Sequence, residues 1–266
     1  MENIFLAFGL TLIAGLSTGI GSLIAFFAKK TNTKFLSLTL GFSAGVMLFV
    51  SMIEIYPEAI NYFLVAGKTE KISKLLTAIS FFCGMFFIGL IDKLLPEDKN
   101  PHESKLVECD PCPEDNSKKL MRMGIFTALA IVIHNFPEGI ASFVSALGDT
   151  SVAIPIFVAI ALHNIPEGIA VSVPIYQATS SKKKAFLFSF LSGLSEPIGA
   201  LIGYLILMPF LNNFIFGIIF AFVAGIMVYI SLDELLPSAR EYGHHHLSIY
   251  GMIIGMITMC ISLLLF

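Results

Sequence analysis

Long apolar stretches alternate with short polar segments along the whole chain. Each stretch has about 20 residues or more, the length of helix that crosses the hydrocarbon core of a bilayer. A helix satisfies its own backbone hydrogen bonds, which lipid cannot do, so each stretch is predicted to be a transmembrane helix. The eight predicted spans are 4–28, 35–57, 74–95, 121–147, 152–177, 183–208, 212–237 and 248–266, with a long polar loop at 96–120.

The composition supports the same fold class. Of the 266 residues, 56% are hydrophobic and only 13% are charged, a balance that a soluble domain of this size does not need to build one core. We therefore predict an all-α polytopic membrane protein whose single transmembrane domain covers residues 1–266. Its first partner is the lipid bilayer, and its expected location is a cell membrane, crossed several times.

The Lys and Arg residues predict the orientation of the spans, because cytoplasmic loops carry an excess of them. Of the 16 basic residues, only Lys68, Lys71 and Lys74 fall on one side of the predicted membrane. The other side is therefore predicted to be cytoplasmic, which puts the loop 96–120 inside and both termini outside. The formal net charge of −3 gives no support to nucleic-acid binding. The remaining basic residues, all on the cytoplasmic side, are Lys29, Lys30, Lys34, Lys93, Lys99, Lys105, Lys118, Lys119, Arg122, Lys182, Lys183, Lys184 and Arg240.

Two parts of the chain repeat each other. Residues 42–59, FSAGVMLFVSMIEIYPEA, match residues 222–239, FVAGIMVYISLDELLPSA, without gaps, and residues 14–24 match residues 192–202 in the same way. The matched positions include Glu54 with Glu234 and Pro57 with Pro237, so the similarity extends beyond small and apolar residues. Under the predicted topology the matched spans run in opposite directions. Helices 1–3 and 6–8 are therefore predicted to be inverted repeats, an arrangement typical of transporters; the alternative is a chance match between similarly packed helices.

The hexapeptide HNxPEG occurs twice, as HNFPEG at 134–139 and HNIPEG at 163–168. Both copies lie near the middle of consecutive, antiparallel spans, so they are expected to face each other deep in the bilayer. In each copy His and Glu are four residues apart, which puts both side chains on one helix face. The two pairs are His134 with Glu138 and His163 with Glu167.

Ionisable side chains at the bilayer centre cost about 2.5–3.5 kcal/mol each on insertion scales, so four of them together need compensation. A divalent cation provides it, because two His nitrogens and two Glu oxygens form a four-ligand set of the kind that zinc accepts. Asn135 and Asn164 are rotated by about 100° from these side chains and offer amide oxygens to a second, harder ion. Amide and carboxylate oxygens also suit iron or manganese. The alternative is a purely structural pairing of His and Glu between the two helices.

The prolines and glycines of the motif predict a locally opened helix. Pro137 and Pro166 each remove one backbone hydrogen bond and leave the carbonyl four residues earlier without its usual donor. Gly139 and Gly168 allow backbone or ligand to come close. We expect such segments to line a cavity rather than to serve packing alone.

The sixth span contributes another intramembrane acid, Glu196. It lies opposite Thr18 in the repeat alignment, so the first repeat lacks it, and Pro197 follows directly and is expected to break the helix. No Lys or Arg occurs in any predicted helix interior to pair with it. Glu196 is therefore predicted to be a further ligand.

Two weaker signals lie in the predicted cytoplasmic loops. Cys109 and Cys112 have the C-x-x-C spacing of thiolate metal ligands, with His102 nearby, and a flexible solvated loop is the alternative. The run His244–His246 follows the seventh span and is a candidate to accept an emerging ion.

Five segments, taken together, resemble the ZIP family of metal transporters, and within it the bacterial ZupT subgroup: residues 41–55, 134–144, 163–171, 192–199 and 223–237. The resemblance covers nearly the whole chain. It implies an eight-helix bundle with a binuclear centre on helices 4 and 5. One metal would use His134, Glu138, His163 and Glu167, and the second Asn135, Glu138, Asn164, Glu167 and Glu196, so that both Glu residues of the motifs bridge. It also implies uptake of zinc, iron, manganese or cobalt across the bacterial plasma membrane into the cytoplasm, with the metal as cargo and no catalytic cofactor.

The main alternative is a membrane metalloenzyme, in which paired His and Glu ligands hold a catalytic di-metal centre. The chain lacks an H-E-x-x-H motif, and the full ligand set leaves no open coordination position, so we expect no enzyme. A passive channel or metal sensor is a third alternative, distinguished by rate and saturation. Metal preference, energy coupling and oligomeric state stay open at this point, a homodimer included.

Overall fold

The computed structural model describes residues 2–27, 33–94, 113–148, 150–210, 212–241 and 244–265, and within them every regular element is a helix. The elements are α1 (Glu2–Phe27), α2 (Thr33–Val50), α3 (Tyr56–Val65), α4 (Glu70–Leu94), α5 (Pro113–Gly148), α6 (Thr150–Thr179), α7 (Lys182–Gly193), α8 (Ser195–Leu207), α9 (Asn213–Ile230), α10 (Leu236–Glu241) and α11 (His245–Leu265). Two π-helical segments, Ser51–Ile55 and Ser231–Leu235, and the 3₁₀ turn Met208–Phe210 complete the list.

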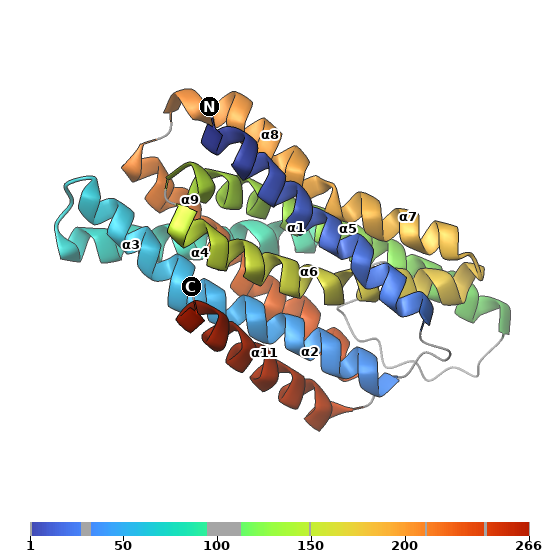
Figure 1. Cartoon of the computed structure of the whole chain (residues 1–266). Helices are drawn as coiled ribbons and strands as arrows, with labels where there is room; N and C mark the ends of the chain where they lie inside the picture. The colour runs from blue at the N-terminus through green and yellow to red at the C-terminus, as the bar shows by residue number, and fades with distance from the viewer. Residues whose placement is uncertain are drawn as a thin grey trace.

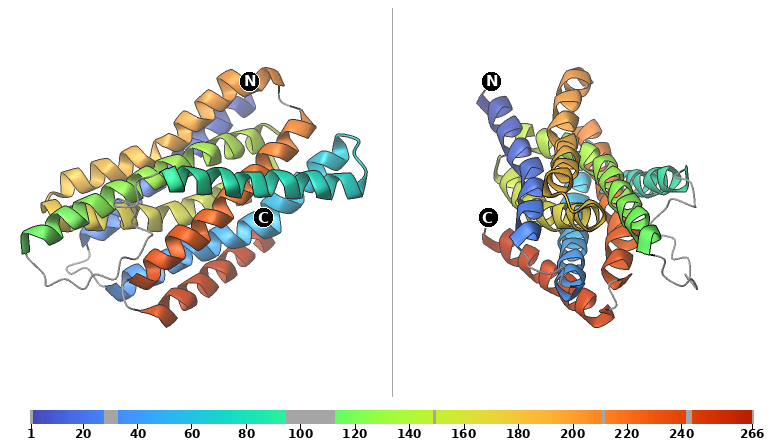
Figure 2. Two further views of the ribbon diagram at one scale, coloured as in Figure 1. Left: turned by 180° about the vertical axis from the view of Figure 1, so that it is seen from behind. Right: turned by 90° about the vertical axis from the view of Figure 1, so that its right-hand side faces the viewer.

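The helices form an elongated bundle with their axes roughly along its length (Figures 1 and 2). Two long helical segments each consist of several elements. α2 continues through the first π segment into α3, and α9 continues through the second into α10. The α3–α4 connection and both chain termini lie at one end of the bundle, and the start of α7 lies at the other (Figure 1). Lys68 and Lys182–Lys184 are therefore at opposite ends.

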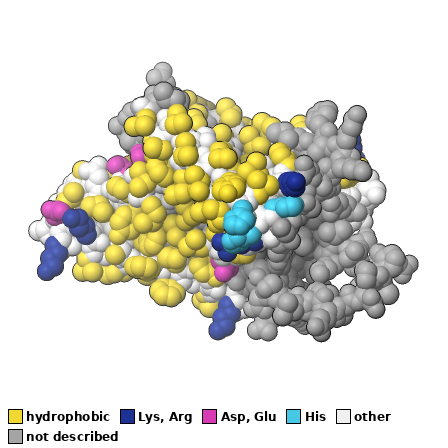
Figure 3. All heavy atoms as spheres, turned by 90° about the horizontal axis from the view of Figure 1, so that it is seen from below, with side chains coloured by type: hydrophobic (Ala, Val, Ile, Leu, Met, Phe, Trp, Pro, Cys, Tyr) yellow, Lys and Arg dark blue, Asp and Glu magenta, His cyan; other side chains and the backbone are white. Residues whose placement is uncertain are grey.

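Seven helical segments are long and apolar enough to cross a membrane, counted over the described residues: 4–23, 37–65, 70–91, 127–144, 182–206, 213–240 and 245–264. Their outward faces carry large apolar side chains, such as Phe5 (78% exposed), Phe86 (77%) and Leu264 (81%). Figure 3 shows such side chains as a broad apolar surface on the face in view. An apolar surface of this extent is stable in lipid and not in water, so the chain is a multi-pass membrane protein. The fifth predicted span, 152–177, lies in α6, which is not among these seven segments.

The helices pack in two matching sets. α1 packs on α6 as α8 packs on α5, and α11 packs on α2 as α4 packs on α9. The glycines match as well, because a Cβ at Gly45 would meet the Met252 carbonyl of α11, and one at Gly225 would meet the Phe81 carbonyl of α4. Both π segments begin at a serine, Ser51 and Ser231, 180 residues apart. The π-helical geometry was not predicted; its hydrogen bonds run from residue i to residue i+5, and such segments often occur at functional positions.

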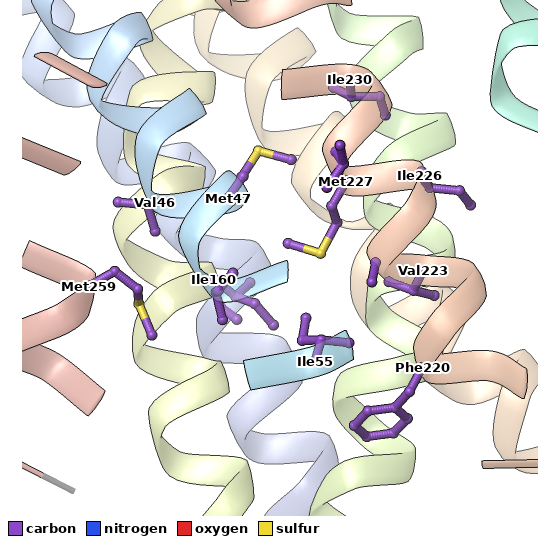
Figure 4. Packing of buried hydrophobic residues seen from close by; sticks show 14 of the residues in the cluster. Val46, Met47, Ile55, Ile160, Phe220, Val223, Ile226, Met227, Ile230 and Met259 are labelled. Carbon is purple, nitrogen blue, oxygen red and sulfur yellow. The ribbon is translucent and has the colours of Figure 1, made fainter. Parts of the chain in front are cut away.

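The largest apolar core contains residues from most helices. Met47 of α2 and Met227 of α9 are fully buried in it and are 180 residues apart. Figure 4 shows both thioether side chains extending into the space between α2 and α9, with Ile160 of α6 below them. Met fills such irregular spaces well because its side chain is unbranched and flexible. This apolar packing lies next to the helices that carry the HNxPEG motifs.

Helix disruption was predicted at three prolines, and the structure differs from the prediction at two of them. α5 and α6 run through Pro137 and Pro166 without interruption, so the motifs are not opened segments. Both helices pack on each other and on α8 or α1, and this packing can offset the backbone hydrogen bond that each proline removes. The sixth span does break, at Leu194 between α7 and α8, directly before Glu196 and Pro197, as predicted.

Candidate metal centre

The two HNxPEG motifs lie on neighbouring helices, α5 and α6, which pack against each other. Six of the seven predicted site residues have described side chains, and each of the six is at least 98% buried. The side chain of the seventh, His134, lies outside the described part of the structure. The six buried residues are Asn135, Glu138, His163, Asn164, Glu167 and Glu196.

One contact between the motifs joins His163 to Glu138. The His163 Nε2 atom lies 3.2 Å from Glu138 Oε1 and 3.4 Å from Oε2, so the ring of α6 faces the carboxylate of α5. The backbone carbonyl of His163 also accepts a hydrogen bond of 3.3 Å from Ser43 Oγ of α2. The imidazole and carboxylate predicted to share one metal ion are therefore within reach of one small cation.

A second polar contact joins the motif of α6 to α8. Asn164 Nδ2 donates to Glu196 Oε2 at 2.9 Å and to the Ala14 carbonyl oxygen of α1 at 3.0 Å. The two donated hydrogen bonds fix the amide orientation, because only the NH₂ end of the side chain can donate. The amide oxygen therefore points away from Glu196 and Ala14, and the carboxylate of Glu196 is held beside the motif.

Several oxygen atoms of the site have no hydrogen-bond donor among the described residues. They include Asn135 Oδ1, Asn164 Oδ1 and Glu196 Oε1, and Asn135 Nδ2 has no acceptor either. A buried polar atom without a partner costs about 1–3 kcal/mol, and more for a charged group. Amide and carboxylate oxygens are ligands that divalent cations accept. The donor set fits a cation held between α5, α6 and α8.

Three carboxylates are concentrated in this volume. Glu167 interacts electrostatically with Glu138 and His163, and Glu196 with Glu138 and Glu167. Buried like charges repel each other strongly, because the surroundings screen them weakly. A divalent cation removes this repulsion, so the arrangement favours binding of positive ions and disfavours anions.

The motif glycines allow two helices to come close to the site. A Cβ at Gly139 of α5 would meet the Glu196 carbonyl of α8, and a Cβ at Gly168 of α6 would meet the Thr18 carbonyl of α1. The prediction that a neighbour approaches at these glycines is confirmed, and the neighbour in both cases is a helix backbone. The glycines thus bring α8 and α1 against the motifs and position Glu196.

The seven-residue ligand set stays a prediction. Among the described side chains no three His, Cys, Asp or Glu residues are arranged to hold one metal ion, a test that leaves out amides and the side chain of His134. His102, Cys109 and Cys112 lie outside the described residues. His245 and His246 are exposed, with ring centroids 5.6 Å apart, while His244 is half-buried.

Sequence reasoning missed the backbone partner of Asn164. The Ala14 carbonyl lies 150 residues earlier in the chain and belongs to no motif of ionisable residues. Ser43, which donates to the His163 carbonyl, was likewise not singled out. The only available signal was the repeat itself, since both residues lie in or beside the repeated segments 14–24 and 42–59.

The chain is similar to known transporters along most of its length. The family model described as ZIP Zinc transporter matches residues 95–263. The chain belongs to the ZIP zinc transporter family. A protein of Streptococcus mutans serotype c named Zinc transporter ZupT is 62% identical over 267 residues, covering 100% of this chain and 99% of the relative. Proteins of the same name from Clostridium perfringens (60% over 279 residues, 100% and 98% covered) and Lysinibacillus sphaericus (62% over 266 residues, 99% and 98% covered) are similar.

Membership of this ZIP family removes the metalloenzyme alternative. Each of these relatives is named a zinc transporter. The match covers nearly the whole length of each relative and nearly the whole length of this chain. The predicted ZupT-type membership is therefore confirmed, and the protein is not an enzyme. The buried cluster on α5, α6 and α8 belongs to a membrane transporter.

Proposed function

We propose that this ZIP protein takes up zinc, and also iron, manganese or cobalt, into the bacterial cytoplasm through a two-ion site in the plasma membrane. The observation that carries the proposal is the contact of His163 with Glu138 at 3.2 Å, both fully buried at the α5–α6 interface. A buried pair of His and Glu contributes little to the stability of the fold, because the cost of removing both groups from water offsets their attraction. They are favourable when a cation shares them.

The proposed ligand sets follow the two motifs. One ion is held by His134, Glu138, His163 and Glu167, a nitrogen and oxygen set suited to zinc. The other is held by oxygens of Asn135, Glu138, Asn164, Glu167 and Glu196, which suit iron or manganese as well. Glu138 and Glu167 bridge the two ions, and their electrostatic interaction with Glu196 supports a shared, compact volume.

The proposed membrane topology has eight spans, with α6 as the fifth, both termini outside and the loop after α4 inside. The matching packing of α1 on α6 and α8 on α5 supports an inverted repeat, and so does the equal spacing of the two π segments. An inverted repeat can expose the same site to one side and then to the other by rocking one half against the other. We therefore propose alternating access as the mechanism.

In this mechanism the residues of α5, α6 and α8 replace the hydration shell of the incoming ion. Glu138, Glu167 and Glu196 provide negative charge, and Asn164 orients the carboxylate of Glu196 by its donated hydrogen bond of 2.9 Å. Protons compete with metal ions for the same imidazole and carboxylate groups. Uptake is expected to weaken as the external pH falls, because protonation removes the ligands' lone pairs and charge.

The proposal is tested by uptake of radioactive zinc, iron and manganese into proteoliposomes. Wild-type uptake should saturate with metal concentration, which a passive channel would not show at the same concentrations. Glu138→Gln and Glu167→Gln keep the side-chain shape but remove the charge, and each should reduce uptake by at least about tenfold. Glu70→Gln is the matched control, because Glu70 is 72% exposed and pairs with Lys74 on the same helix, a contact of little energetic value. Normal uptake by both buried variants would contradict the proposal.

A further inference from the structure

Thr18 and Glu196 are matched positions of the two repeated segments, and they lie on the two sides of the point where α1 crosses the end of α7. The crossing is centred on Gly15 and Gly193, where each glycine meets the other's carbonyl. The Glu196 Cβ lies 3.4 Å from the position of a Cβ at Gly15, and the Thr18 Cβ lies 2.9 Å from that of a Cβ at Gly193. As described above, the Glu196 backbone packs on α5 and the Thr18 backbone packs on α6. The repeat thus places a carboxyl on one side of the crossing and a hydroxyl on the other.

The hydroxyl of Thr18 differs from those of four other threonines in the described helices. It is fully buried, and no described residue forms a hydrogen bond with it. Four other threonines donate to the carbonyl four residues earlier, at 2.7–2.9 Å: Thr11, Thr39, Thr179 and Thr258. For Thr18 that carbonyl belongs to Ala14.

The Ala14 carbonyl is already occupied. It accepts hydrogen bonds from Ser17 Oγ at 2.6 Å and from Asn164 Nδ2 at 3.0 Å. As part of α1 the same oxygen also accepts the backbone N–H of Thr18, so three donors already share its two lone pairs and the Thr18 hydroxyl would be a fourth. The network that positions Asn164 and Glu196 therefore leaves the Thr18 hydroxyl directed to another partner.

The side chain of Asn135 on α5 likewise has no hydrogen-bond partner among the described residues. Its amide is fully buried, and neither end forms a hydrogen bond within the described residues. Asn135 and Asn164 are equivalent positions of the two HNxPEG motifs, and Asn164 pairs with Glu196. The residue equivalent to Glu196 on the side of Asn135 is Thr18. By this equivalence Asn135 and Thr18 correspond to the pair Asn164 and Glu196, with a hydroxyl in place of the carboxylate.

We propose that Thr18 is a specificity-determining residue of the transport site, supplying with Asn135 the neutral oxygens that face the cation opposite Glu196. This inference rests on the proposed transport function. The number of charged ligands tunes the affinity of an oxygen site for divalent cations. Glu138, Glu167 and Glu196 already supply three carboxylates, so a fourth at position 18 would hold the ion more tightly and release it more slowly. The neutral hydroxyl keeps binding reversible.

The test measures zinc and manganese uptake kinetics in proteoliposomes for three variants. Thr18→Val keeps the shape and removes the hydroxyl, so the KM for zinc should rise about fivefold, as expected for about 1 kcal/mol, with little change in Vmax. Thr18→Ser keeps the hydroxyl and should restore the wild-type KM. Thr18→Glu should lower both KM and Vmax and favour manganese over zinc, because it adds a hard, charged oxygen.

Thr77→Val is the matched control. Thr77 of α4 is also fully buried with no hydrogen bond to its hydroxyl from the described residues, but it lies on the helix that packs against α3 and α9. Its loss should leave both KM values unchanged. If Thr77→Val raises KM as much as Thr18→Val does, the effect is a general one of buried threonines and the proposal is overturned.

Failure of this inference is distinguishable from failure of the transport function. If Glu138→Gln loses uptake while Thr18→Val keeps the wild-type KM and metal ratio, transport stands and the role of Thr18 is overturned. If Thr18→Val reduces Vmax and protein yield without changing KM, and Thr18→Ser does not restore them, Thr18 has only a structural role. If Thr18→Glu does not fold, the comparison of Val with Ser decides alone.

Discussion

Asn164 Nδ2 lies 2.9 Å from Glu196 Oε2, and the same nitrogen lies 3.0 Å from the Ala14 carbonyl oxygen. One buried amide therefore joins α6 to α8 and to α1. These three helices come from different parts of the chain, and two of them, α1 and α8, contain the matching sequence segments 14–24 and 192–202 in whole or in part. The amide links the position of a metal-ligand candidate to the packing of the bundle.

We expect Asn164→Ala to destabilise the protein and to reduce its response to zinc. The change leaves the Glu196 carboxylate and the Ala14 carbonyl with one donor fewer, at a cost of at least about 2 kcal/mol. Thermal unfolding in detergent, with and without zinc, measures both effects. Asn61→Ala is the control, because Asn61 lies on α3 and its hydrogen bonds within the described residues are two long contacts of 3.4–3.5 Å with Glu58. Equal melting temperatures for the two variants would contradict the assigned role.

Gly139→Ala and Gly168→Ala are expected to destabilise the bundle strongly. The added methyl groups would collide with the backbone carbonyls of Glu196 and Thr18, which cannot rotate away as a side chain can. Overpacking of this kind costs about 1–3 kcal/mol or more and would also displace Glu196 from the site. Lower melting temperatures together with weaker zinc uptake are the expected outcome.

Gly9→Ala is the comparison for these glycine variants. Gly9 lies in the same kind of helix, but nothing lies within 4 Å of a Cβ at its position. Its substitution should be neutral or stabilising by up to about 1 kcal/mol, because Ala favours a helix more than Gly does. If all three variants melt alike, the close approach at Gly139 and Gly168 has no energetic importance.

The proposed topology predicts which ends of the bundle are accessible from outside the cell. In a variant without the four native cysteines, a membrane-impermeant thiol reagent should label Lys68→Cys in intact cells. Lys183→Cys should be labelled only after permeabilisation, because the start of α7 lies at the opposite end of the bundle (Figure 1). Labelling of Lys183→Cys in intact cells, with Lys68→Cys protected, would reverse the topology.

The sequence by itself determined which segments are helices, which family the chain belongs to and which side chains are buried on α5 and α6. These properties are local: hydropathy decides whether a stretch enters the bilayer, and the HNxPEG residues could only be buried there. The same local argument predicted the break in the sixth span next to Pro197. It failed at Pro137 and Pro166, where packing by neighbouring helices keeps α5 and α6 continuous.

Only the tertiary structure decided which polar atoms meet. The hydrogen bonds of Asn164 with Glu196 and with Ala14 join residues 32 and 150 positions apart. Such contacts depend on the rotation and depth of each helix against its neighbours, which glycine crossings such as Gly15 with Gly193 determine. Hydropathy is almost the same for every rotation of an apolar helix, so the pattern of residues could not select one. Close packing of backbones selects the one that brings these side chains together.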